Sequence, residues 1–278
     1  MLVEDKKTRP GHYLSFSLLL IAAVASLLPL YWMLVTALQQ PTLTVTFPPE
    51  WSPANPTFLN FGRFLERPYV IRWTTNSLGI SLIITGVQLF TCAMSGYAFA
   101  KKQFPGGSIL FYLYIASMMV PAQVTLVPLF LIMSRLDFLD TYWGLVLPGI
   151  AGPFGVFLMK QFISTLPTDL LEVATIDGCG EWGVFTQIIL PLAKPGLAVL
   201  GIFTFMGQWN QFLWPLIITN SSAMRTLPVG LALLQEELPM QYGLLMAGAT
   251  YAAIPMIMIF LMFQKYFLKG ITVGALKG

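Results

Sequence analysis

The stretch from Glu172 to Pro195, EVATIDGCGEWGVFTQIILPLAKP, lies between two strongly apolar runs of the chain. It is the least hydrophobic stretch in the second half of the sequence, and glycines and prolines interrupt it. The neighbouring runs, residues 141–159 and 195–224, carry no charged residue. A polar segment between two such runs is expected to lie in water between two membrane helices, so it decides the fold class.

The beginning of this segment predicts a short helix followed by a turn. Asp169 precedes an apolar stretch and Glu172 follows it three residues later, which is the spacing of a capping box with Asp169 as the N-cap. The helix is expected over Leu170–Ile176. Asp177 and Gly178 then predict a stop and a turn, because glycine readily adopts the backbone conformation that ends helices.

A second short helix is expected over Glu181–Leu190, with Pro191 ending it. The two helices form a helix-turn-helix outside the membrane that is joined at both ends to membrane helices. Small Ala174 and Gly178 are expected to leave an open surface that another protein can approach closely. A partner that displaces this segment must therefore push on both attached helices.

The charge of the helix-turn-helix argues against nucleic acid as a partner. DNA binding relies on lysine and arginine contacts to phosphate. Here the acidic residues outnumber the nearby cations, and they are Asp169, Glu172, Asp177 and Glu181.

The composition of the whole chain is that of a membrane protein. Hydrophobic residues make up 56% of the sequence and charged residues 10%, whereas soluble domains carry about a quarter charged residues. A membrane helix needs about 20 apolar residues, and the charge-free runs predict an all-α membrane protein with about six transmembrane helices in a single domain over residues 1–278. The expected spans are Leu14–Thr36, Thr75–Phe99, Ile109–Met133, Tyr142–Phe162, Gly196–Ile218 and Leu244–Phe267.

The lysines predict the orientation of this domain. With about six spans, every lysine falls on the face that holds both termini and a loop over residues 163–195, here called the interspan segment. The outer loops, 38–73, 134–141 and 219–243, have only arginines as cations, and a short helix is expected in the first of them over Phe61–Glu66. The positive-inside rule makes the lysine face cytoplasmic.

The N-terminal apolar run could also belong to a signal peptide. It is too long for the hydrophobic region of one, and no clear small-residue cleavage site follows it, so it is expected to remain as the first span. Gly149, Gly152 and Gly155 recur at helical spacing in the fourth span and favour close helix packing. Prolines inside the spans predict kinks, which are either hinges or tolerated bends.

No ionisable residue lies near the middle of a predicted span. Ion-coupled transporters usually place such residues in the membrane, so the sequence argues strongly against proton coupling and less strongly against sodium coupling, since carbonyls can hold sodium. The chain has no paired carboxylate or nucleophile–base pair within a span, no G-x-x-x-x-G-K-[ST] loop, and neither clustered cysteines nor more than one histidine for a metal site. Energy for any transport is therefore expected to enter from outside the bundle.

The interspan segment also resembles a known motif. E-V-A-x-x-D-G followed by I-I-L-P-L-A-K-P is similar to the EAA loop of binding-protein-dependent ABC importer permeases, with Val173 in place of the usual alanine. SGYAFAKKQFPG (residues 95–106), WNQFLWPL (209–216) and QKYFLKGITVGALKG (264–278) are similar to the carbohydrate-importer branch, specifically its maltose-transporter-type second permease. The resemblance covers roughly residues 76–278.

The resemblance implies a type I ABC importer permease fold in which the interspan segment is a coupling helix that docks on a cytoplasmic ATPase subunit. The residues assigned to this contact are Glu172, Ala174, Asp177, Gly178, Leu190 and Pro191. Helix capping is an alternative role for Glu172. A weaker second contact is expected in the tail at Lys269, Gly270 and Lys277, whose alternative role is to orient the last helix.

The implied partners are a second permease subunit, two ATPase subunits that bind ATP and magnesium, and an extracytoplasmic solute-binding protein. No cofactor is expected on this chain itself. Gln208, Trp209, Asn210 and Gln211 are a candidate substrate pathway, because amides exchange hydrogen bonds with hydroxyls and an indole can lie against a sugar ring. Hydrogen bonding between helices is the alternative role for these residues.

The sequence thus predicts a non-catalytic permease subunit, in the cell (inner) membrane, of an ATP-driven importer for a neutral sugar, oligosaccharide or related polyol. The rival interpretation is a self-sufficient secondary transporter or channel, which predicts flux without an ATPase. A membrane-embedded scaffold with no transport role is a third possibility.

Overall fold

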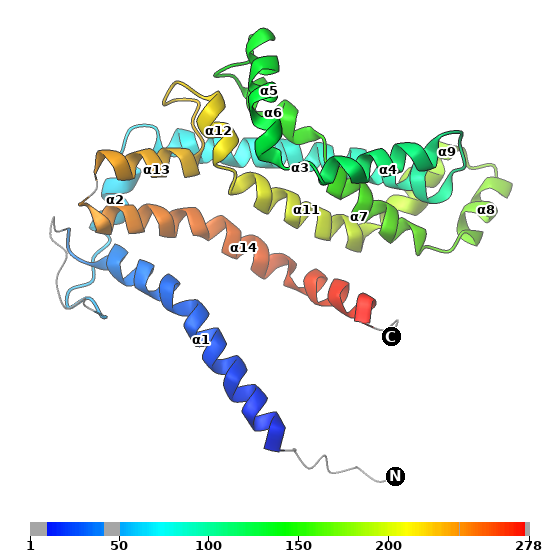
Figure 1. The fold of residues 1–278 in the computed structure, drawn as a ribbon. Helices are drawn as coiled ribbons and strands as arrows, with labels where there is room; N and C mark the ends of the chain where they lie inside the picture. Colours follow the sequence, from blue (N-terminus) through cyan, green and yellow to red (C-terminus); the bar gives the residue numbers. More distant parts are fainter. Residues whose placement is uncertain (1–9, 42–50, 239, 276–278) are drawn as a thin grey trace. The chain divides into compact units, whose positions relative to one another are not determined.

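The computed structural model describes residues 10–41, 51–238 and 240–275, and within these ranges every regular element is a helix (Figure 1). Among them, 4 helical stretches are long and apolar enough to cross a membrane, and two bent helix pairs raise the number to 6 if each pair counts as one span. The all-α membrane fold predicted from composition is confirmed.

The elements are, in chain order, α1 Pro10–Leu38, α2 Leu59–Leu65, α3 Val70–Lys101, α4 Gly107–Met118, α5 Ala122–Arg135, α6 Tyr142–Ile150, α7 Pro153–Ser164, α8 Asp169–Ile176, α9 Glu181–Gly183, the π-helix η1 Val184–Ile189, α10 Leu190–Leu192, α11 Lys194–Trp209, α12 Leu213–Ile218, α13 Leu227–Glu237 and α14 Tyr242–Ala275. The first, second and sixth predicted spans are single helices, α1, α3 and α14. The fourth is the stretch Tyr142–Ser164, made of α6 and α7, and the short helix expected in the first outer loop is α2.

The third predicted span is not one helix. It consists of α4 and α5, whose axes bend by 101° at a short break, so the prediction of a continuous helix over Ile109–Met133 is wrong. Pro121 explains the break, because proline has no backbone N–H to continue the helix and disfavours helical backbone in the residue before it. Pro121 itself is extended, with ψ 133°, and α5 begins directly after it.

The fifth predicted span is also interrupted. α11 ends at Trp209 and α12 begins at Leu213, so the prediction of a continuous helix over Gly196–Ile218 is wrong. In an unbroken helix, the ring of Pro215 would clash with the carbonyl four residues earlier. The break places Pro215 in the first turn of α12, where no backbone N–H is needed.

The chain divides into two compact units, residues 1–67 with 233–253 and residues 68–232 with 254–278. In the first unit, the Nδ2 of buried Asn60 donates hydrogen bonds to the carbonyls of Ala37 (3.0 Å) and Gln39 (2.8 Å), which holds α2 against the end of α1. In the second unit, α3 is the central helix and packs on α6, α7 and α11 (Figure 1). The single transmembrane domain over residues 1–278 stays a prediction.

Glycines allow α3 to approach α6 and α7 closely. A Cβ atom at Gly149 would lie 2.6 Å from Ile84 Cδ1, and one at Gly155 would lie 2.6 Å from Cys92 Sγ. Between these points, a Cβ atom at Gly152 would lie 2.6 Å from the Oε1 of Gln88. The prediction that these glycines serve helix packing is confirmed. A larger residue at any of the three positions would force these α3 side chains, or α3 itself, to shift, because such separations are too short for real contacts.

Two prolines in the α6–α7 span leave backbone carbonyls without their helical donors. Pro148 cannot bond to the carbonyl of Gly144, and Pro153 cannot bond to that of Gly149. Side chains from other helices supply the missing hydrogen bonds: the Nε1 of Trp214 donates to Gly144 (2.9 Å), and the Nε2 of Gln88 donates to Gly149 (2.6 Å). Both carbonyls are thereby satisfied at a depth where an unpaired one would be costly.

Candidate functional site

The interspan segment begins differently from the prediction. Asp169 is the first residue of α8 and not its N-cap; the N-cap position is Thr168, whose backbone is already helical and whose side chain makes no capping bond. The Nζ of Lys101 accounts for this, because it donates a hydrogen bond to the Thr168 hydroxyl oxygen (3.2 Å). The predicted capping box between Asp169 and Glu172 is therefore wrong. Both carboxylates still lie in the first turn, where their negative charge interacts favourably with the dipole of the helix and stabilises it.

The turn after α8 confirms the predicted stop. Gly178 has φ +81°, in the left-handed region, and its N–H donates to the carbonyl of Thr175 (3.1 Å). The N–H of Cys179 donates to the carbonyl of Ala174 (2.9 Å). These two bonds form a Schellman motif, which ends α8 sharply. Apart from the chain neighbours of Gly178, no atom of the described residues lies within 4 Å of the position that its Cβ would occupy.

The two faces of α8 differ from the expected arrangement. Ala174 is buried in the chain's own hydrophobic core together with Leu171, so the expectation of an open surface at Ala174 is wrong. On the other face, Ile176 is 83% exposed and Val173 is 56% exposed. Glu172, Asp177 and Gly178 are exposed as well. Val173 and Ile176 were not predicted as surface residues, although their separation of three places them on the face opposite Leu171 and Ala174.

The second half of the interspan segment is one continuous helical run. α9, η1 and α10 follow one another from Glu181 to Leu192, so the prediction that Pro191 ends the helix is wrong. Pro191 is the second residue of α10 and lies inside this run. It is exposed, whereas Leu190 is half-buried against the core. The chain then bends by 76° at Ala193 into α11.

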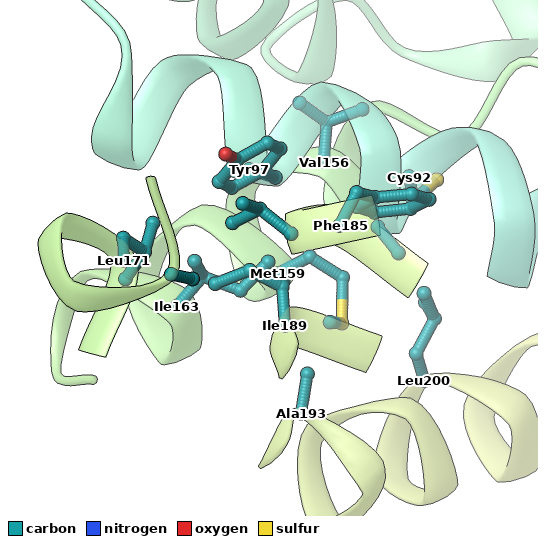
Figure 2. Close-up of a cluster of buried hydrophobic side chains, with 13 residues drawn as sticks. Cys92, Tyr97, Val156, Met159, Ile163, Leu171, Phe185, Ile189, Ala193 and Leu200 are labelled. Atoms are coloured by element: carbon teal, nitrogen blue, oxygen red, sulfur yellow. The ribbon is translucent and has the colours of Figure 1, made fainter. Parts of the chain in front are cut away.

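A hydrophobic cluster joins the interspan segment to the membrane helices. Figure 2 shows Phe185 of η1 beside Tyr97 of α3, and the two rings are stacked with centroids 5.8 Å apart. Ile189 of η1 and Met159 of α7 are fully buried in the same cluster. A force on the interspan segment would therefore reach α3 and α7 through close packing, because packed cores transmit displacement with little compression.

A polar contact joins the same elements nearer the surface. The Nζ of Lys102, at the end of α3, lies 2.6 Å from the Oε1 of Glu181, and the Tyr97 hydroxyl donates to the Oε2 of Glu181 (3.2 Å). The hydrogen bond that Lys102 donates to the Glu181 carboxylate raises the pKa of Lys102 above its usual value. The pair is largely exposed, so its contribution to stability is small, on the order of 0–1 kcal/mol.

A cavity of about 480 Å³ lies between α3, α5, α6 and α11–α12, all in the second unit. Gln208 and Gln211, two of the residues expected in a substrate pathway, line it, and so do Gln88 and Gln123. Gln88 and Gln123 were not predicted, although a polar amide inside an otherwise apolar span is a usable signal. None of the described residues around the cavity is charged; they are Ser77, Ile80, Gln88, Ala122, Gln123, Thr125, Leu126, Leu129, Leu145, Pro148, Gly149, Ala151, Gln208, Gln211, Leu213, Trp214, Pro215 and Thr226.

The two other residues predicted for this pathway lie elsewhere. Trp209 is 2% exposed and its ring is nearly parallel to that of Phe205, with centroids 6.0 Å apart. Asn210 caps the end of α11, and its Nδ2 donates to the carbonyl of Met206 (3.0 Å). Neither side chain lines the cavity. The indole beside the cavity is that of Trp214, whose N–H is held by Gly144.

The predicted tail contact is only partly within the structure. The backbone at Lys269 and Gly270 belongs to α14. Lys277 lies outside the described residues.

Comparisons with known proteins agree with this architecture. Residues 93–273 match the family described as "Binding-protein-dependent transport system inner membrane component". The arabinooligosaccharides transport system permease protein AraQ of Bacillus subtilis is 44% identical over 207 residues, which is 74% of each chain. The sn-glycerol-3-phosphate transport system permease protein UgpE of Yersinia pestis is 36% identical over 199 residues, which is 71% of each chain.

The fold matches a solved structure of a bacterial ABC transporter involved in the import of the acidic polysaccharide alginate. The TM-score is 0.83 at 21% identity, over 96% of this chain and 100% of the other. The long helical spans, the exposed helix and turn between two of them and the matched residues lead to one conclusion. This chain belongs to the family of binding-protein-dependent transport system inner membrane components, the permease subunits of ABC importers.

Proposed function

We propose that this chain pairs with a second permease subunit and that two ATPase subunits drive the pair through the interspan segment. The observation that supports this most strongly is the exposed turn at Gly178, which is attached through η1 to a core shared with α3 and α7. The ATPases would bind ATP and magnesium, while this chain would hydrolyse nothing itself. The lysine face, including both termini and the interspan segment, would be cytoplasmic.

In the proposed mechanism, the ATPase contacts the exposed side of α8 and the turn, at Glu172, Val173, Ile176, Asp177 and Gly178. Closure of the ATPase pair displaces α8 and η1 together, because α8 packs on η1. The displacement is passed through the buried aromatic and aliphatic side chains to the membrane helices. ATP hydrolysis then returns the segment to its starting position and the bundle to its inward-facing state.

The proposed substrate is a neutral sugar, oligosaccharide or related polyol, delivered by an extracytoplasmic solute-binding protein. The uncharged cavity supports this choice, because amide and hydroxyl groups bind hydroxyls while offering no counter-charge to an anion. The curated relatives transport arabinooligosaccharides and glycerol phosphate, respectively. The lack of a cation among the described cavity residues favours the first kind of substrate over the second.

Reconstitution into liposomes tests the proposal. The chain is reconstituted alone, and in parallel with its partner permease, ATPase subunits and solute-binding protein, and uptake of labelled arabino-oligosaccharides is measured. We expect uptake only in the complete complex and only with ATP. Flux through the chain alone, with or without an ion gradient, would instead support a secondary transporter or channel.

A further inference from the structure

A second polar cavity, of about 250 Å³, lies where α3 ends and α4 begins, and its residues differ from those of the larger cavity. It is here called the lysine pocket. Its lining consists of Phe99, Lys102, Gln103, Phe104, Gly107, Ser108, Phe111, Tyr112 and Lys160. We propose that the lysine pocket binds the phosphate of an anionic phospholipid headgroup.

The charge of the pocket selects an anion. Its described lining includes two lysines and no acidic residue. The Lys160 ammonium lies 3.5 Å from the centroid of the Phe111 ring, a cation–π contact, and within the described ranges it forms no ion pair. Lys102 is already paired with Glu181, so Lys160 supplies the uncompensated positive charge of the pocket, and Lys102 adds further N–H donors. Ser108 and Gln103 add neutral hydrogen-bond donors for phosphate oxygens.

The surroundings of the pocket favour a lipid over free phosphate, although both present the same phosphate chemistry. The membrane-spanning stretch of α3 ends at Lys101, next to the pocket, which places the lysines where a span leaves the bilayer. Beside them, α4 exposes large apolar side chains, with Ile109 and Tyr112 each 68% exposed and Leu113 59% exposed. Acyl chains can cover such a surface while the headgroup occupies the pocket. Basic pockets between membrane helices on the cytoplasmic side bind anionic headgroups in this way.

A bound headgroup would join three elements. Lys102 caps α3, Lys160 belongs to α7, and Ser108 is in the first turn of α4. No side chain caps the N-terminus of α4, so its first backbone N–H groups add a favourable field for a phosphate. The lipid would therefore fix the start of α4 against α7 and the end of α3.

Lipid titration of the purified full-length chain tests this inference. The delipidated chain in neutral detergent is titrated with dioleoylphosphatidylglycerol, with dioleoylphosphatidylcholine or with sodium phosphate, and bound lipid is counted by native mass spectrometry. We expect a preference for phosphatidylglycerol that millimolar phosphate does not abolish. Lys160→Gln is expected to weaken binding roughly fivefold, and the double variant Lys102→Gln/Lys160→Gln to weaken it further.

Matched variants separate the pocket from general charge effects. Lys194→Gln removes an exposed lysine outside the pocket and should leave binding unchanged, and Lys160→Arg should preserve it. Ser108→Asp places a carboxylate in the pocket at a position that favours helix formation, so it should expel the lipid without unfolding the chain. Undiminished binding in the double variant and in Ser108→Asp, an equal loss in Lys194→Gln, or full displacement by free phosphate would overturn the inference. Because no ATP, ATPase or sugar is needed, the result is independent of the proposed transport function.

Discussion

Gly178 combines a left-handed backbone with open space on its outer side. The backbone conformation is required for the Schellman motif that ends α8, and the open space is where a partner can reach the main chain. Gly106, at the start of α4, has nearly the same geometry, with φ +80° and, apart from its chain neighbours, no described atom within 4 Å of a Cβ position. The two glycines therefore allow the backbone requirement to be separated from the proposed docking role.

We expect Gly178→Asp to leave membrane insertion intact and to abolish association with the ATPase subunits, because the new side chain projects into the proposed contact. Backbone strain from the left-handed conformation amounts to about 1 kcal/mol and is the same at Gly106. Co-purification of the ATPase with each variant is the measurement. Gly106→Asp should retain the ATPase, and retention by Gly178→Asp would contradict the assigned contact.

Trp214 provides the second prediction at this scale. Trp214→Phe keeps most of the ring but removes the N–H that bonds to the carbonyl of Gly144, which Pro148 leaves without a helical donor. We expect the free energy of unfolding to fall by about 1 kcal/mol, a typical value for one hydrogen bond between membrane helices. Thermal unfolding in detergent measures the change. The exposed Trp143, changed to Phe in the same way, should leave the unfolding temperature unaltered.

The candidate pathway shows what single residues reveal before a structure exists. Four consecutive residues cannot all lie on one face of a helix, so residues 208–211 could not line one cavity together. The sequence could not indicate which of them would, because α11 ends within this group and Asn210 is needed as its C-cap. Gln88 was overlooked because its chemical role, as a donor to Gly149, depends on a helix 61 residues away in the sequence.

At the scale of elements, the interspan segment was predicted in outline and missed in detail. Glycine and acidic residues located α8 and its turn correctly, since these signals act within a few residues. The role of Thr168 was missed because Lys101, on another helix, occupies its hydroxyl. The π-helix η1 was not predicted, because π-helices are rare and periodicity alone predicts an ordinary α-helix over these residues.

The cluster behind η1 leads to a prediction about force transmission. Phe185→Leu removes the ring that stacks on Tyr97 but leaves the exposed face of α8 unchanged. We expect ATPase co-purification to persist, stability to fall by about 1 kcal/mol, and sugar uptake per ATP hydrolysed to drop severalfold. Uptake and hydrolysis are measured together in proteoliposomes. The exposed Phe154, changed to Leu, serves as the control, and unchanged uptake per ATP in Phe185→Leu would refute the proposed route.

At the scale of the whole molecule, the all-helical membrane fold followed from composition, because an apolar run of sufficient length has few alternatives to crossing a bilayer. The described helices give 4 spans, or 6 if each bent pair counts as one span. The interruptions did not follow. A proline within an apolar run is compatible with a kink, a sharp break or a tolerated bend, depending on which neighbouring side chains satisfy the freed carbonyls. Pro121 and Pro215 coincide with breaks, whereas α14 continues through Pro255.

The native cysteines allow the orientation of the molecule to be tested. Cys92 is buried within α3, whereas Cys179 is partly exposed in the interspan segment. If the lysine face is cytoplasmic, a membrane-impermeant maleimide should label the chain in inside-out vesicles and not in right-side-out vesicles. Labelling is measured by mass shift, with Cys179→Ser as the unlabelled control. Labelling of Cys179 in right-side-out vesicles would reverse the assigned topology.

The Trp214 indole and the Gln88 amide, which donate hydrogen bonds to the carbonyls of Gly144 and Gly149, also constrain how the protein can open. Moving α6 away from Gln88 or Trp214 would break a hydrogen bond that no helical N–H can replace, so α3, α6–α7 and α12 are expected to move together. Helices that separate during a transport cycle must then do so outside the group formed by α3, α6–α7 and α12. Water would therefore enter the glutamine-lined cavity beside these helices and not between them.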